Sequence, residues 1–194
     1  MKKLLFSLAL CALVAAPIGA RIKVRTEFDP TADFTKLKTF AWPADAPGQV
    51  KMMLTKDDDP EALRKRFEPT LMAAAEAALT AKGFVKVAPG QPSDFLVAYF
   101  ALVSINNEAQ TVGQFLPSTV AWGVPPFLAT TSSLKIFEQG SLVMDVWTPD
   151  KKPMWRGVAQ AEMHREKPQP EREKRVREAI TDILKQFPPK PKKK

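Results

Sequence analysis

Few residues of this chain have the type and spacing that catalysis or metal binding requires. His164 is the only histidine among the 194 residues, and a Ser-His-Asp set or a zinc site would depend on it. It follows a predicted strand and precedes Arg165 and Glu166, a setting typical of a solvated strand end. The sequence contains no glycine-rich nucleotide motif and no nucleophile-elbow pattern. We therefore predict no catalytic residue, no metal ligand and no cofactor, and expect that the protein is not an enzyme.

A cluster of three carboxylates, which could indicate a calcium site, is formed by Asp57, Asp58 and Asp59. A calcium loop places its ligands at alternating positions and adds a glycine and a distal glutamate, and none of that spacing is present. Asp59 is followed by Pro60, a pair typical of a helix start, where the helix dipole favours negative charge. The cluster is therefore interpreted as the beginning of a helix.

Asp145 alternates with Val143 and Trp147, so it shares a mostly apolar face of a predicted strand. A carboxylate in such a position is a candidate catalytic group. The alternative is an ion pair with Arg156 on the next predicted strand, and we favour it because cross-strand pairs of opposite charge stabilise sheets.

The first twenty residues have the layout of a secretory signal peptide. Lys2 and Lys3 precede an apolar run over 4–16, and Pro17 and the small residues at 19–20 follow. The run is well short of the roughly 20 residues that span a bilayer as a helix. We predict cleavage of residues 1–20 after the alanine at position 20, and a location in the periplasm or outer envelope.

Cys11 is the only cysteine, and it lies inside this apolar run. The mature chain therefore has no disulfide and no thiolate site. A lipoprotein signal is an alternative, but Leu10 is too large for the position before an acylated cysteine. We expect no lipid anchoring through Cys11; an uncut segment that stays as an anchor is a third alternative.

The basic charge is concentrated at the C-terminus. Of the formal net charge of +8, four charges belong to Lys190, Lys192, Lys193 and Lys194. Residues 188–194 are interpreted as a solvated basic tail, and these lysines are the contact that a membrane surface would use. No aromatic side chain is interleaved with them for base stacking, so we predict no nucleic-acid partner.

Residues 21–187 are predicted to form one α+β domain, with a mainly antiparallel sheet and two amphipathic helices packed on one face. Periodicity and turn signals predict strands over 21–28, 39–42, 84–87, 95–103, 134–138, 141–147 and 155–163, with the last three as a meander. Helices are predicted from Asp59 to Gly83, with a kink or break at Pro69, and over 170–187. Residues 43–58 are predicted to be a polar loop.

The stretch 106–133 is long, has no clear period and is unusually apolar for a loop. Its large side chains include Phe115, Leu116, Trp122 and Phe127, which are the candidate contacts for a partner or ligand. The alternative, equally weighted, is that the stretch folds over the uncovered face of the sheet and is core.

Six segments, in this order along the chain, together resemble the bacterial domain-of-unknown-function 4136 family. They are FDPTADF (28–34), KTFAW (38–42), AKGF (81–84), SDFLVAY (93–99), EQGSLVMD (138–145) and WRG (155–157). The resemblance implies a small α+β domain in the cell envelope and supplies no catalytic residues. Many members of that family carry an acylated cysteine where this chain has the residues 19–21.

These observations lead to one expected function and two alternatives. We expect an exported envelope protein, without enzyme activity, that acts as a binding or assembly accessory for another envelope protein. The first alternative is a carrier of an apolar ligand between the sheet and the 106–133 stretch, and the second is an enzyme of unrecognised type.

Replacing Phe115, Trp122 and Phe127 together by serine tests the two interpretations of the 106–133 stretch. We expect loss of partner or membrane association with an unchanged free energy of unfolding, because exposed aromatic side chains contribute to binding rather than to the core. Co-sedimentation and denaturant unfolding measure the two quantities. A loss of several kcal/mol of stability, as for emptied core aromatic sites, would instead assign the stretch to the core.

Overall fold

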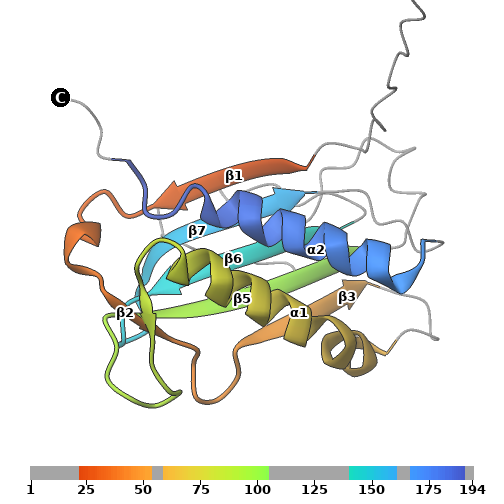
Figure 1. Cartoon of the computed structure of the whole chain (residues 1–194), viewed down its shortest axis with the longest axis horizontal. Coiled ribbons are helices and arrows are strands. Elements are labelled where there is room, and N and C mark those ends of the chain that lie inside the picture. The colour runs from red at the N-terminus through yellow and green to blue at the C-terminus, as the bar shows by residue number, and fades with distance from the viewer. Residues whose placement is uncertain (1–21, 54–58, 105–139, 161–166, 191–194) are drawn as a thin grey trace, which may run out of the picture.

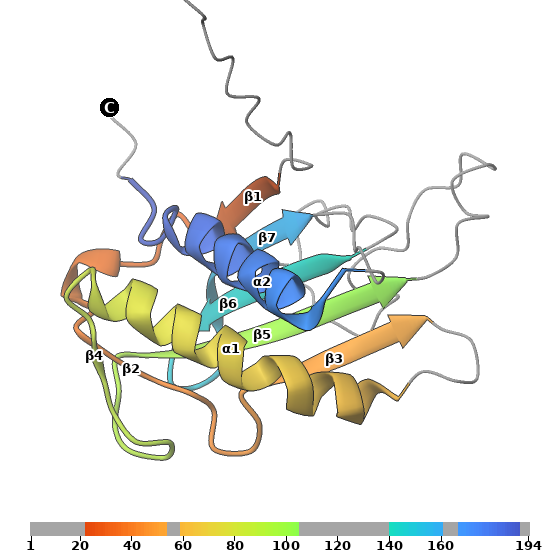
Figure 2. The same cartoon turned by 45° about the vertical axis from the view of Figure 1, so that its right-hand side comes forward.

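The computed structural model describes residues 22–53, 59–104, 140–160 and 167–190. Two helices lie side by side on one face of a seven-stranded mixed sheet (Figures 1 and 2), which is the predicted α+β class. The elements in chain order are β1 (Lys23–Phe28), a short 3-10 helix (Phe34–Lys36), β2 (Thr39–Ala41), β3 (Gly48–Met53), α1 (Pro60–Thr80), β4 (Val85–Lys86), β5 (Phe95–Ser104), β6 (Ser141–Trp147), β7 (Pro153–Gln160) and α2 (Gln169–Leu184).

One half of the sheet is antiparallel, as predicted. The strand order is β1-β7-β6-β5-β2-β4, and the three pairings from β1 to β5 are all antiparallel. The long apolar run of β5 lies in the middle of the sheet, which confirms its prediction as a central strand. The predicted strand 134–138 lies outside the described residues. β6, its predicted neighbour in the meander, pairs with β5 along one edge and with β7 along the other.

The other half of the sheet is parallel, so the sheet that was predicted to be mainly antiparallel is mixed. β2 pairs with the start of β5, β3 pairs with the rest of it, and β2 also pairs with β4. All three pairings are parallel because α1 carries the chain back along the sheet between β3 and β5. A crossover of that length returns the next strand in the same direction, whereas a tight hairpin reverses it.

The prediction of a polar loop over 43–58 is wrong for its central part, which is β3. Val50 and Met52 alternate there with Gln49 and Lys51, the period of a strand, and β3 pairs with β5 over its whole length. Pro47 and the glycine that follows it suggested a turn and obscured this short alternation.

α1 begins as predicted and passes through its internal proline without a break. The Asp59 carboxylate accepts a hydrogen bond from the Glu61 N–H at 2.8 Å and caps the helix. The helix runs unbroken from Pro60 to Thr80, with Pro69 inside it. The first turns of α1 are angled away from the axis of its later turns (Figure 1), as expected of a helix in which a proline removes one hydrogen bond. Gly83 follows with φ +91°.

Both helices are amphipathic, as predicted, and each buries one apolar stripe. Leu71, Ala75 and Leu79 are the buried residues of α1, whereas Leu63 and Phe67, nearer its start, are only half-buried. The buried residues of α2 are Ala179, Ile180, Ile183 and Leu184.

Phe187 closes the core on the helix side, three residues beyond the end of α2. It is fully buried, and its ring centroid lies 5.3 Å from that of Trp155 and 5.6 Å from those of Phe84 and Phe95. The ring of Phe34 meets it edge-on at 6.1 Å. This aromatic cluster joins the end of α2 to β5, β7 and the 3-10 helix, so it sets where α2 lies on the sheet.

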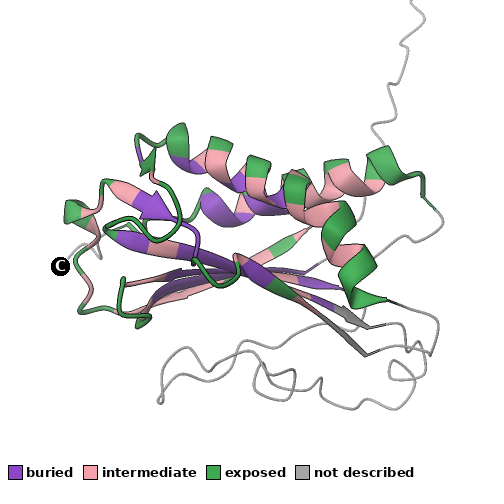
Figure 3. Cartoon of the chain, turned by 90° about the horizontal axis from the view of Figure 1, so that it is seen from below, coloured by how far each residue is buried: buried purple, intermediate pink, exposed green. Residues whose placement is uncertain are grey.

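The opposite face of the sheet is also buried at its centre. Phe100, Leu102, Val143 and Val158 form a second apolar cluster, separate from the one beneath the helices. Among the described residues no helix or strand lies over this face (Figure 3).

Asp145 and Arg156 lie beside this second cluster and form the predicted cross-strand ion pair. They are register partners on β6 and β7, with exposed fractions of 0% and 2%. The Arg156 guanidinium donates from Nε to Oδ1 and from Nη2 to Oδ2, both at 2.6 Å. Burial raises the pKa of Asp145, and the guanidinium acts against that rise. A carboxylate held on both oxygens is a structural group rather than a catalytic base.

Gly157 leaves the room that close packing of α2 requires. A Cβ at this position would lie 2.5 Å from Ile183 Cγ2 and 2.5 Å from an atom of the Trp155 ring. Replacing Gly157 by alanine should lower the free energy of unfolding by about 1–3 kcal/mol, measured by denaturant unfolding. Adding Ile183→Ala should cost less than the sum of the two single changes. Unchanged stability of the Gly157→Ala protein would contradict this packing.

Removing one partner of the buried ion pair should be costly. Asp145→Asn removes the carboxylate that accepts both hydrogen bonds from the buried guanidinium, so we expect the free energy of unfolding to fall by about 3–5 kcal/mol. The double variant Asp145→Leu with Arg156→Met should recover most of that loss. Asp150→Asn, which breaks an exposed pair with Lys152, is the control and should leave stability nearly unchanged. A single variant as stable as the control would refute the structural role.

Candidate binding groove

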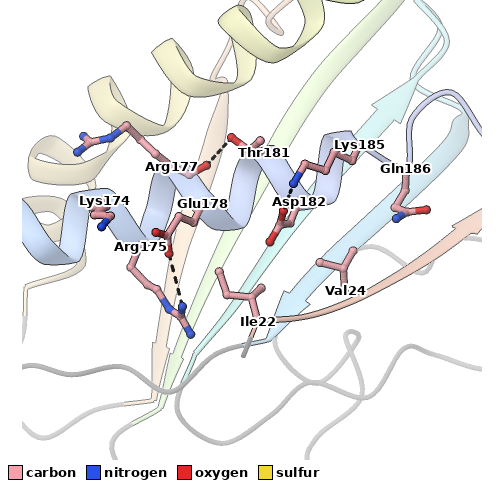
Figure 4. A pocket seen from close by; sticks show the side chains of 10 residues that line it. All are labelled: Ile22, Val24, Lys174, Arg175, Arg177, Glu178, Thr181, Asp182, Lys185 and Gln186. Atoms are coloured by element: carbon pink, nitrogen blue, oxygen red, sulfur yellow. Dashed lines mark hydrogen bonds and ion pairs between the residues drawn. The ribbon is translucent and has the colours of Figure 1, made fainter. Parts of the chain in front are cut away.

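A groove of about 590 Å³ lies between the edge strand β1 and α2 (Figure 4). Ile22 and Val24 supply its apolar floor, and the outer face of α2 supplies a polar wall. The residues of that wall are Lys174, Arg175, Arg177, Glu178, Thr181, Asp182, Lys185 and Gln186.

The groove follows from the periods of its two elements. Along β1, which lies in the predicted strand 21–28, Val24 faces the helices while Lys23 and Arg25 are exposed on the other face. In α2 the apolar residues face the core. The residues at positions 174, 178, 181 and 185 lie three or four apart and therefore share one side of the helix, away from the core and next to β1.

The groove wall carries a net positive charge. Three cationic side chains and two carboxylates point along it, whereas the lining residue Arg177 extends its side chain away from Ile22 and Val24 (Figure 4) and lies 3.8 Å from Glu173. Arg175 lies 3.5 Å from Glu178, and Lys185 lies 2.6 Å from Asp182. Lys174 is exposed and makes no ion pair or hydrogen bond with another residue that the structure describes. The wall is therefore suited to an anionic group.

The outer backbone of β1 borders the same groove. The Asp29 N–H donates to the Met154 carbonyl at 2.9 Å, just past the strand's pairing with β7. In an antiparallel pair the residues that exchange hydrogen bonds alternate with those that do not, so Arg25 faces β7. The N–H and C=O groups of Val24 and Thr26 then face away from the sheet, and no described strand lies on that side.

Two polar clusters beneath α1 hold that helix on the sheet. The fully buried Tyr99 donates from its hydroxyl to Glu68 at 2.8 Å. Burial raises the pKa of Tyr99 well above its ordinary value, and the Glu68 carboxylate adds to the rise, so the phenol stays a donor. The Trp42 indole N–H donates to Glu76 at 2.9 Å, and Lys86 lies 2.6 Å from the same carboxylate.

Two other carboxylates have shifted pKa values with structural causes. Hydrogen bonds from the Thr39 and Lys38 N–H groups lower the pKa of Asp94 and tie its loop to β2. Burial raises the pKa of Glu27, and the neighbouring Arg156 opposes that rise. Neither group lies in the groove.

Most residues that the sequence singled out lie outside the described part of the chain. The predicted contacts Phe115, Leu116, Trp122 and Phe127 are among them, as are His164, Cys11, Asp57, Asp58, Lys192, Lys193 and Lys194. Lys190 is described and exposed. Sequence reasoning predicted the strand and the amphipathic helix that border the groove but missed the groove itself, because no local pattern indicated that β1 pairs with β7.

Within the described ranges, no group of three or more histidine, cysteine, aspartate or glutamate side chains is placed to hold a metal ion. A helix with the length and apolarity to cross a membrane is likewise absent from the part of the chain that the structure describes.

Comparisons with known proteins give a family and a fold. The crystal structure of a DUF4136 family protein from Bacteroides thetaiotaomicron is similar with a TM-score of 0.53 and 16% identity, covering 86% of this chain and 96% of that one. A PDZ domain protein from Parabacteroides distasonis gives a TM-score of 0.50 at 12% identity, covering 89% of this chain and 37% of that one. No relative is found among the curated proteins. The model of the domain of unknown function DUF4136 matches residues 24–189, and the chain belongs to that family.

Proposed function

We propose that the protein is a non-enzymatic binding or assembly accessory of the cell envelope. The observation that carries this proposal is the groove between β1 and α2, which combines an open strand edge with a charged wall. The ion pair of Asp145 also supports a function without catalysis, because Arg156 binds both oxygens of this candidate catalytic carboxylate. The signal-like residues 1–20 favour the envelope as the place of action.

A carrier of an apolar ligand is the second candidate, and the groove favours it less. Only Ile22 and Val24 among its ten lining residues are apolar. Sites for apolar ligands are lined predominantly by hydrophobic and aromatic side chains. An unrecognised enzyme is third, because Asp145, the candidate catalytic carboxylate that the structure describes, is engaged by Arg156 on both oxygens.

The test is expression of the full chain with a C-terminal affinity tag in a Gram-negative host, followed by fractionation, intact mass and cross-linking. We expect an envelope fraction, a mass that corresponds to cleavage after position 20, and a discrete cross-linked partner. A mass that includes Cys11 with acyl chains would overturn the cleavage site. An uncleaved cytoplasmic protein would overturn the envelope role, and a melting-temperature increase with lipids alone would favour the carrier.

A further inference from the structure

We propose that β1 binds an extended acidic segment of a partner protein as an additional strand, which lies in the groove beside α2. This inference rests on the proposed binding function and specifies its site and its partner's chemistry. Three features of the groove carry it: the outward backbone groups of Val24 and Thr26, which no described strand pairs, the apolar floor and the surrounding charge.

The backbone supplies the first feature. Among the described strands, β1, β3 and β4 each pair on one side only; β1 and β3 have six residues and β4 has two, and of the three only β1 lines the groove. Its outward N–H and C=O groups, at Val24 and Thr26, are spaced as an added strand requires. Recognition of this kind draws its affinity from main-chain hydrogen bonds, and its selectivity from pockets for alternate side chains.

The groove supplies the place for those alternate side chains. An added strand continues the pleat of the sheet, so every second side chain points to the helix side, beside Ile22 and Val24. Figure 4 shows both residues below the polar wall of α2. Small apolar side chains of the peptide fit the floor.

Charge selects the acidic partner. The remaining side chains of the added strand point to the opposite face, where Lys23 and Arg25 are exposed. On the helix side the wall adds three cations against two carboxylates, and one of the three, Lys174, has no ion-pair partner among the described residues. Acidic residues at alternate positions would thus lie beside Lys23 and Arg25, while the intervening apolar side chains lie on the floor of the groove, near the net positive charge of its wall. A second copy of β1 is disfavoured, because antiparallel pairing would bring Lys23 and Arg25 of both copies together, and like charges destabilise such pairs.

The probe is a labelled synthetic peptide in which valine alternates with glutamate, and the mature protein is the receptor. We expect saturable binding and slower amide exchange at Val24 and Thr26 by NMR, with little change at Arg25, whose N–H already bonds β7. A peptide with lysine in place of glutamate, and one with methylated backbone nitrogens, should each bind at least tenfold more weakly. Equal binding of either control, or unchanged exchange at Val24 and Thr26, would overturn the inference.

Two protein variants separate backbone pairing from surface charge. Thr26→Pro removes an outward N–H without removing a bond to β7, a position where an edge strand tolerates proline. It should weaken peptide binding at least tenfold, while the matched Thr26→Val protein binds as the unchanged protein does. Melting temperatures confirm that both fold; if the proline variant unfolds, the methylated peptide and the exchange data decide alone.

Replacing Lys23 and Arg25 by glutamate should weaken binding of the acidic peptide at least tenfold and strengthen binding of the lysine peptide. Three outcomes contradict the inference: no binding of the acidic peptide, self-association of the protein that Thr26→Pro abolishes, or binding only to vesicles of phosphatidylglycerol. In the cross-linking experiment, a partner retained by Thr26→Pro would leave the binding function standing while removing β1 as its site. Absence of any partner of the unchanged protein would remove the function itself.

Discussion

Burial of both faces of the central strands is the constraint on which this structure depends. β5 presents Tyr99 and Phe95 to the helices and Phe100 and Leu102 to the opposite side, all buried. On the helix side, aromatic packing around Phe187 buries the central strands. The opposite side carries an ion pair, and removing these charges from water is costly. The pair is stable only because the guanidinium bonds both carboxylate oxygens. Aromatic packing thus stabilises one face of the central strands, and a buried ion pair the other.

The groove is a consequence of how that core is closed. Phe187 anchors the chain just past α2 against Trp155 of β7, and Gly157 lets Ile183 of α2 come close to the same strand. α2 is therefore centred over β7, the neighbour of β1, and β1 lies beneath the edge of the helix. A side chain larger than glycine at position 157 would push α2 outward and change the groove. The core packing and the candidate site are coupled through this one strand.

The sequence predicts the parts of the molecule that local periodicity controls. Asp59, Pro60 and Gly83 mark the ends of the first helix, because capping signals act within a few residues. The alternation around Asp145 predicts its pairing with Arg156, because the two strands are neighbours in sequence. The parallel pairing of β3 with β5 depends on where α1 delivers the chain, and no local pattern encodes that. The groove was missed for the same reason: Lys174 and Val24 are 150 positions apart in sequence, and only the fold brings them to one side.

The charges on β1 serve two requirements with one set of residues. An exposed edge strand is a template for pairing with any other strand, and lysine or arginine on such a strand is a common defence against self-association. Lys23 and Arg25 repel a second copy of β1 for that reason, yet the same charges attract a strand of opposite charge. Thr26 adds nothing to either effect through its side chain, but its N–H faces outward and can be used by whichever strand arrives. Protection from aggregation and selection of an acidic partner are therefore the same electrostatic property of this edge, and a change that neutralises it should weaken both together.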